Sequence, residues 1–144
     1  MPTNGDPVTG YAVDTSVAVP ALDSGHAAHA ACRAIVQRLR PALAGHAAFE
    51  TFSVLTRMPG HITVDAPTAA EIIERVFETT VWLAPGDSAA LQARLSVTGI
   101  IGGAVYDALV GEAARVNGLQ LLTRDRRATS TYIMLGTPYQ LIEP

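Results

Sequence analysis

Short apolar runs alternate along the chain with longer segments in which apolar residues recur every three or four positions. The short runs predict buried strands, and the longer segments predict amphipathic helices. We expect strands at 11–13, 43–44, 81–83, 119–123 and 139–142, and helices at 26–38, 47–57, 68–77, 87–97, 104–116 and 128–135, with one short helix after Asp14. Strands this short and uniformly apolar are typical of a mostly parallel sheet covered by helices, so the pattern predicts an α/β fold.

Polar residues before two of the helical segments are candidate helix caps. Thr15 or Ser16 is expected to cap the helix that follows the first strand. Thr68 is expected to cap a later helix, with Glu71 completing a capping box three residues on.

The chain has 144 residues, which is the size of one domain. We expect residues 1–10 to form a flexible N-terminus and residues 11–144 to form that domain. The N-terminal stretch has no signal-peptide pattern, and no apolar run is long enough to span a membrane, so we expect a cytoplasmic protein with no membrane contact. Cys32 is the one cysteine, which excludes an intramolecular disulfide and a cysteine zinc cluster.

The charged residues narrow the chemistry further. All ten basic residues are arginines, so phosphotransfer, Schiff-base and Walker A chemistry that needs a lysine is excluded. The net charge of −3 gives no general attraction for a polyanion.

Four acidic residues stand where an unpaired charge is costly. Asp14 and Asp125 follow predicted strands, at the edge of the sheet where α/β folds form their sites. Glu50 and Asp107 lie inside apolar helical segments. Each has an ordinary explanation, as a helix cap, a turn residue or a first-turn charge. One shared cause explains all four, because carboxylates brought together repel one another unless a divalent cation such as Mg²⁺ or Mn²⁺ binds them.

The four acids also carry a resemblance. The segments 13–16, 49–57, 105–109 and 121–127 resemble, in this order, the motifs of the PIN-domain family, and in particular of VapC-type toxins from bacterial toxin–antitoxin pairs. The resemblance covers residues 11–144 and implies a PIN-like α/β/α sandwich around a short, mostly parallel central sheet. It also implies a Mg²⁺-dependent endoribonuclease toxin that hydrolyses RNA, including transfer RNA, and so inhibits growth or translation.

The resemblance also implies roles for single residues. Asp14, Asp107 and Asp125 are expected to bind the metal directly or through water, while Glu50 binds a second ion or orients the attacking water. The hydroxyls of Ser16 and Thr123 are expected to donate hydrogen bonds to the carboxylates that bind the metal. The candidates for contact with RNA are three arginines, Arg124, Arg126 and Arg127. The alternative for these arginines is a solvated loop that contacts no ligand. Where relatives often carry a basic residue, before the third acid, this chain has Gly102–Ala104.

Further implications of the resemblance concern partners. A cognate VapB-type antitoxin and a homodimer are both expected from the family. The alternative function is a PIN-like module that binds RNA or a protein without cutting it. A phosphatase or phosphotransfer domain with Asp14 as nucleophile is a weaker alternative, because Thr15–Ser16 stands where such hydrolases carry a second aspartate.

Overall fold

The computed structural model describes residues 10–57 and 64–143. The expected flexible N-terminus lies outside these residues except for Gly10. The described residues form a sheet of five strands, β1 (Tyr11–Val13), β2 (Ala42–Ala44), β3 (Thr80–Val81), β4 (Gln120–Thr123) and β5 (Tyr139–Leu141). Their order is β3-β2-β1-β4-β5, and every pair in this sheet is parallel. The sheet is thus parallel throughout the described residues, where the sequence predicted a mostly parallel one.

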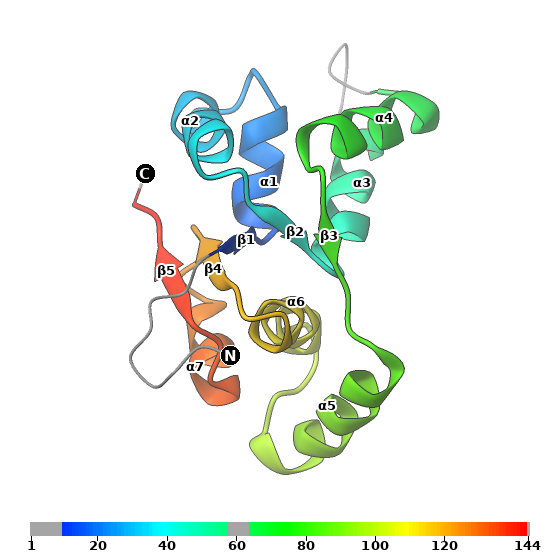
Figure 1. Ribbon diagram of the computed structural model, residues 1–144, viewed down its shortest axis with the longest axis vertical. Coiled ribbons are helices and arrows are strands. Elements are labelled where there is room, and N and C mark those ends of the chain that lie inside the picture. Colours follow the sequence, from blue (N-terminus) through cyan, green and yellow to red (C-terminus); the bar gives the residue numbers. More distant parts are fainter. Residues whose placement is uncertain (1–9, 58–63, 144) are drawn as a thin grey trace.

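Seven helices surround the sheet in the described part of the chain. They are α1 (Thr15–Leu22), α2 (His29–Leu39), α3 (Ala47–Arg57), α4 (Ala66–Val76), α5 (Pro85–Thr98), α6 (Ala104–Val116) and α7 (Thr129–Leu135). Figure 1 shows α1 and α2 on one side of the sheet and α6 and α7 on the other. The predicted α/β/α architecture is therefore confirmed. No described helix has the length and apolar character that a membrane crossing requires.

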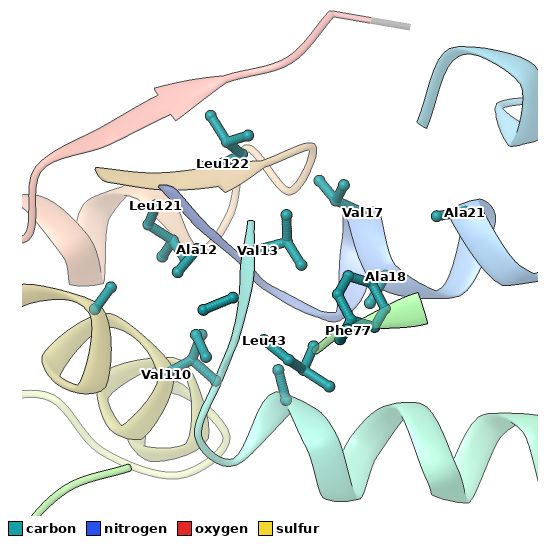
Figure 2. Packing of buried hydrophobic residues seen from close by; sticks show 14 of the residues in the cluster. Ala12, Val13, Val17, Ala18, Ala21, Leu43, Phe77, Val110, Leu121 and Leu122 are labelled. Atoms are coloured by element: carbon teal, nitrogen blue, oxygen red, sulfur yellow. The ribbon is translucent and has the colours of Figure 1, made fainter. Parts of the chain in front are cut away.

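The core is centred on β1, which lies in the middle of the sheet. Val13 and its neighbours Leu43 and Leu122 in β2 and β4 are fully or almost fully buried. Figure 2 shows Val17 of α1 and Val110 of α6 packed in the same cluster with them. A parallel sheet covered on both faces is built from such uniformly apolar strands. The residues that follow β1 and β4 are therefore anchored to the buried core of the molecule.

Two predicted caps are wrong. Asp14 itself caps α1, because its carboxylate accepts a hydrogen bond from the Ser16 N–H at 3.0 Å. Asp65 caps α4 in the same way, by accepting from the Thr68 N–H at 2.8 Å. Each aspartate precedes its helix by the spacing that lets a short carboxylate reach the free N–H groups of the first turn. The helix predicted from Thr68 consequently begins at Ala66.

Other boundaries differ by a few residues. The predicted helices 47–57 and 104–116 match α3 and α6, whereas the helix predicted from 26 begins at His29. The reason is a local turn, in which the Nδ1 atom of His26 accepts a hydrogen bond from the Ala28 N–H at 2.9 Å. The strand predicted at 81–83 is Thr80–Val81, so Trp82 lies beyond the end of the strand.

Candidate active site

The strand order creates one natural position for a site. β1 and β4 are neighbours at the point where the order of strands across the sheet reverses, and α/β proteins place ligands beyond the carboxyl ends of such strands. Asp14 directly follows β1, and Asp125 follows β4 by two residues. Two of the four predicted acids therefore lie at this point of reversal.

Asp14 is held in place by its hydrogen bonds. Its Oδ1 accepts from the N–H of Ser16 and, at 2.5 Å, from the Ser16 hydroxyl, while its Oδ2 accepts from the Tyr132 hydroxyl at 2.9 Å. Only 5 % of the residue is exposed. Burial raises the pKa of the Asp14 carboxyl, and the bonds from Ser16, Thr123 and Tyr132 oppose that rise. The hydrogen bonds therefore favour an ionised carboxylate inside the protein.

The two predicted supporting hydroxyls join the ends of β1 and β4. The Ser16 Oγ accepts from the Arg124 N–H at 2.7 Å, and the Thr123 Oγ1 accepts from the Asp125 N–H at 3.1 Å. The two hydroxyl oxygens lie 3.4 Å apart. The backbone that carries Asp125 is therefore fastened to the residue that holds Asp14.

Glu50 and Asp107 come to this place from the first turns of α3 and α6. Glu50 accepts a hydrogen bond from the Thr15 hydroxyl at 3.1 Å. The pKa of Asp107 is raised to about 6, first by burial and then by the negative charges of Asp125, Glu50 and Asp14. Because the charges of all three other carboxylates act on Asp107, the four predicted acids lie in the same part of the structure.

The three arginines near Asp125 have different environments. The Arg124 guanidinium donates to the Ser16 carbonyl at 3.3 Å, and Arg126 forms an ion pair with Glu143 at 2.7 Å. Arg127 donates its backbone N–H to Asp125, and its guanidinium lies 3.6 Å from the same carboxylate while 94 % of its side chain is exposed. Its positive charge also opposes the raised pKa of Asp107. Among the three, Arg127 is therefore the one whose guanidinium lies beside an acid of the cluster and is almost fully exposed.

The donor set fits a hard divalent cation. No three carboxylate, imidazole or thiol groups in residues 10–57 and 64–143 stand together as a ready set of metal ligands. Mg²⁺, however, keeps several water molecules and needs only one or two carboxylates from the protein. The cluster consists of carboxylates, and no described residue donates a hydrogen bond to Asp107, whose pKa is raised first by burial and then by the other three charges. Oxygen donors with excess negative charge suit Mg²⁺ or Mn²⁺.

Comparison with known proteins identifies this arrangement. The model of the PIN domain matches residues 11–133, a range that contains all four acids. The chain belongs to the PIN-domain family. Ribonuclease VapC27 of Mycobacterium tuberculosis (strain ATCC 25618 / H37Rv) is 44 % identical over 125 residues, which cover 87 % of this chain and 91 % of that protein. Ribonuclease VapC40 of the same organism (strains CDC 1551 / Oshkosh and ATCC 25618 / H37Rv) is 40 % identical over 134 residues, which cover 91 % of this chain and 98 % of that protein. These matches confirm the predicted VapC-type PIN-domain ribonuclease.

Tyr132 is a residue of this PIN domain that sequence analysis missed. It lies in α7, 118 residues after Asp14, and is almost fully buried. Its ring occupies space that Gly111 of α6 leaves free, since a Cβ atom at position 111 would lie 2.8 Å from the Tyr132 Cδ1. From its place in the helical pattern, Tyr132 is predicted only to be a core residue. No signal in the sequence indicates that its hydroxyl reaches an acid.

Replacing Tyr132 with phenylalanine is expected to slow RNA cleavage about 10–100-fold, the usual effect of removing a partner that orients a metal ligand. Phenylalanine fills the same space, so the fold stays intact and the free energy of unfolding falls by about 1–2 kcal/mol. Steady-state cleavage and thermal unfolding measure the two effects. Tyr139→Phe is the matched control, because its ring packs 6.1 Å from that of Tyr132 without belonging to the acid cluster. Cleavage by Tyr132→Phe at the wild-type rate would contradict this role.

Proposed function

We propose that this PIN-domain ribonuclease is a Mg²⁺-dependent endoribonuclease that acts as the toxin of a toxin–antitoxin pair and inhibits growth or translation. The observation that carries the proposal is the cluster of four carboxylates beyond β1 and β4. In this cluster the negative charges of the other three carboxylates contribute to the raised pKa of Asp107. Mn²⁺ is the alternative metal, since it accepts the same oxygen ligands.

Asp14, Asp107 and Asp125 would hold the metal. Asp14 is fixed by Ser16 and Tyr132, and the backbone of Asp125 is fixed through Thr123, so both are already oriented. Asp107 receives no hydrogen bond from the described residues and therefore has both oxygens available. A bound Mg²⁺ would supply positive charge at the scissile phosphate and lower the pKa of a water molecule.

Glu50 would orient the attacking water or bind a second ion. Its Oε1 accepts from Thr15, and the described residues donate no hydrogen bond to its Oε2. Attack of the water oxygen on phosphorus forms one P–O bond while the P–O3′ bond breaks. The proton of the water passes to a carboxylate or to solvent, and the departing 3′ oxygen takes up a proton. The products are a 5′-phosphate and a 3′-hydroxyl.

The RNA substrate is expected to be cut where it is unpaired, such as in the loops of transfer RNA, because unpaired bases can be splayed out and read by a protein. Arg127 is the first candidate for a contact with phosphate because its guanidinium is exposed beside the acids. Arg124 is a second candidate, while Arg126 must first leave Glu143.

A VapB-type antitoxin is the proposed partner. A cavity of about 610 Å³ lies between α1, α2 and α4, on a part of the surface that none of the four acids lines. Its apolar lining includes Leu22, Val36 and Ile72, with Arg33 and Arg40 among its polar residues. A groove of this character suits an amphipathic helix of a partner protein. The expected homodimer stays a prediction.

The function is tested by incubating the purified protein with total cellular RNA in Mg²⁺, in Mn²⁺ and in EDTA. Discrete fragments with 5′-phosphate ends are expected with either metal and not with EDTA. Fragments that form equally in EDTA, or that carry 2′,3′-cyclic phosphates, would contradict the proposed mechanism. Binding of RNA without any cleavage would support the alternative, a PIN-like module that does not cut.

A further inference from the structure

Four ring side chains, of which three are exposed, pack against one another near the helix turns that carry Glu50 and Asp107. The aromatic patch consists of His46, Phe49, Trp82 and Tyr106. The His46 and Tyr106 rings are stacked with centroids 5.2 Å apart and planes 17° apart. Phe49 packs at 6.1 Å from His46 and at 5.6 Å from Trp82, with tilted rings. The patch is therefore a continuous row of rings rather than a set of scattered side chains.

The patch lies along the same edge of the sheet as the acids. Gly45 directly follows β2 with a φ of 49°, where a Cβ atom would lie 3.1 Å from the Ala113 Cβ, and this turn leads into His46 before α3. Trp82 directly follows β3, and its carbonyl accepts a hydrogen bond from the Asn117 side chain at 3.3 Å. Since all strands of the sheet are parallel, the ends of β2 and β3 continue the edge formed by β1 and β4.

Two rings adjoin the acids in sequence as well. Phe49 precedes Glu50 in the first turn of α3, and Tyr106 precedes Asp107 in the first turn of α6. Two of the rings thus belong to the same helix turns as two of the acids.

The exposure of these rings indicates a ligand. Phe49, Trp82 and Tyr106 are 63 %, 51 % and 53 % exposed. Large aromatic side chains are normally buried, and a group of exposed ones marks a binding surface. All four residues of the patch carry rings, so the patch offers the flat faces of these rings to a ligand. Ring faces bind the flat faces of unpaired bases and do so with little preference for sequence.

We propose that the aromatic patch stacks unpaired RNA bases next to the scissile phosphate, an inference that rests on the proposed ribonuclease function. Continuity with the acids favours RNA over a second copy of the chain. The area argues in the same direction, because three half-exposed aromatic side chains offer roughly 300 Å², whereas a stable protein interface buries about 800 Å² per partner. The patch would therefore contribute binding affinity for RNA, which the net charge of −3 does not provide.

The test compares ring-removing with ring-preserving variants. Trp82→Leu and Tyr106→Leu keep apolar bulk but lose the ring, whereas Trp82→Phe and Tyr106→Phe keep a ring. The probes are a fluorescein-labelled, unstructured ten-nucleotide RNA and an abasic oligonucleotide of the same length, and binding is followed by fluorescence anisotropy in EDTA. Each leucine variant is expected to weaken RNA binding about tenfold, with the phenylalanine variants near wild type and the abasic oligonucleotide unaffected. In Mg²⁺ the leucine variants should raise KM more than they lower kcat.

The outcomes separate this proposal from the proposed function. RNA binding that needs the rings, in a protein that never cleaves, would support the patch and contradict the nuclease. Cleavage with unchanged affinity in both leucine variants would overturn the patch and leave the nuclease intact. Wild-type affinity for the abasic oligonucleotide equal to that for RNA would also overturn it. So would a wild-type dimer that Trp82→Leu converts to a monomer in sedimentation velocity without any loss of RNA affinity. Thermal unfolding of each variant is the control that checks whether the fold is retained.

Discussion

Replacing Asp107 with asparagine is expected to reduce RNA cleavage at least about a hundredfold and, at the same time, to make the metal-free protein more stable. Asparagine keeps the shape of the side chain but removes the charge that would hold the proposed metal, and loss of such transition-state stabilisation is worth several kcal/mol. The gain in stability has the same origin. In the metal-free protein the Asp107 carboxylate is partly buried among the charges of Asp125, Glu50 and Asp14.

The pH dependence of this gain follows from the pKa of Asp107, which folding raises from 3.8 to about 6. The folded protein binds the proton more tightly, so the contribution of Asp107 to stability is present below pH 3.8 and is lost as the pH rises through 6. The variant should therefore exceed wild type most clearly at pH 8, by about 1 kcal/mol because solvent screens a half-buried carboxyl. The difference should shrink as the pH is lowered to 4.

Thermal unfolding in EDTA at several pH values measures this difference, and a cleavage assay in Mg²⁺ measures the loss of activity. Glu74→Gln, which removes an exposed carboxylate from α4, is the matched control and should change neither. An Asp107→Asn protein that is both inactive and less stable than wild type at pH 8 would show that the carboxylate supports the fold instead of straining it.

The second large effect is expected at a buried carboxylate away from the site. Glu112 of α6 has 2 % of its side chain exposed and pairs with Arg94 at 3.1 Å and with Arg115 at 2.7 Å. Arg94 also donates to the Leu135 carbonyl at 3.0 Å. The cluster therefore joins α5, α6 and the end of α7, against which the active-site helix α6 packs.

Replacing both Arg94 and Arg115 with methionine is expected to lower the free energy of unfolding by about 3–5 kcal/mol, because Glu112 would remain buried without a compensating charge. The triple variant that also carries Glu112→Met should recover most of this loss, since a buried ion pair replaced by apolar groups is often neutral. Urea unfolding measures both. Arg75→Met is the control, because its pair with Glu71 is exposed and is worth about 0.3–0.5 kcal/mol.

Acid unfolding gives an independent measure of the same cluster. The hydrogen bond from Arg115 lowers the pKa of Glu112, so the stability it provides is present above the ordinary value of 4.5 and is lost as the pH falls through the lowered pKa. The triple variant should lack this part of the acid sensitivity. A double variant as stable as wild type would contradict the role given to the two arginines.

The sequence predicted the fold well where the hydrophobic spacing was regular. Ala47–Arg57 and Ala104–Val116 were predicted with their observed bounds, because each has a clear apolar stripe. The caps were mistaken where two suitable residues stand close together, as Asp65 and Thr68 do. Only the path of the backbone decides which of them reaches the free N–H groups.

The four acids were predictable because each occupies a place where a lone charge is costly, after a strand or within an apolar helix. Tyr132 and the aromatic patch were not predictable in this way. Tyr132 meets Asp14 across 118 residues, and Phe49 meets Trp82 only because β2 and β3 are neighbours. Contacts of this kind arise from the tertiary structure and have no local pattern.

Titration of the metal-free protein with Mn²⁺, followed by calorimetry, tests most directly whether the four carboxylates form one metal site. If they do, wild type binds Mn²⁺ saturably, Asp14→Asn and Asp107→Asn lose that binding, and Glu74→Gln keeps it unchanged. Mn²⁺ binding that survives both aspartate replacements, or RNA cleavage by a wild-type protein that binds no Mn²⁺ or Mg²⁺, would contradict the proposed metal site.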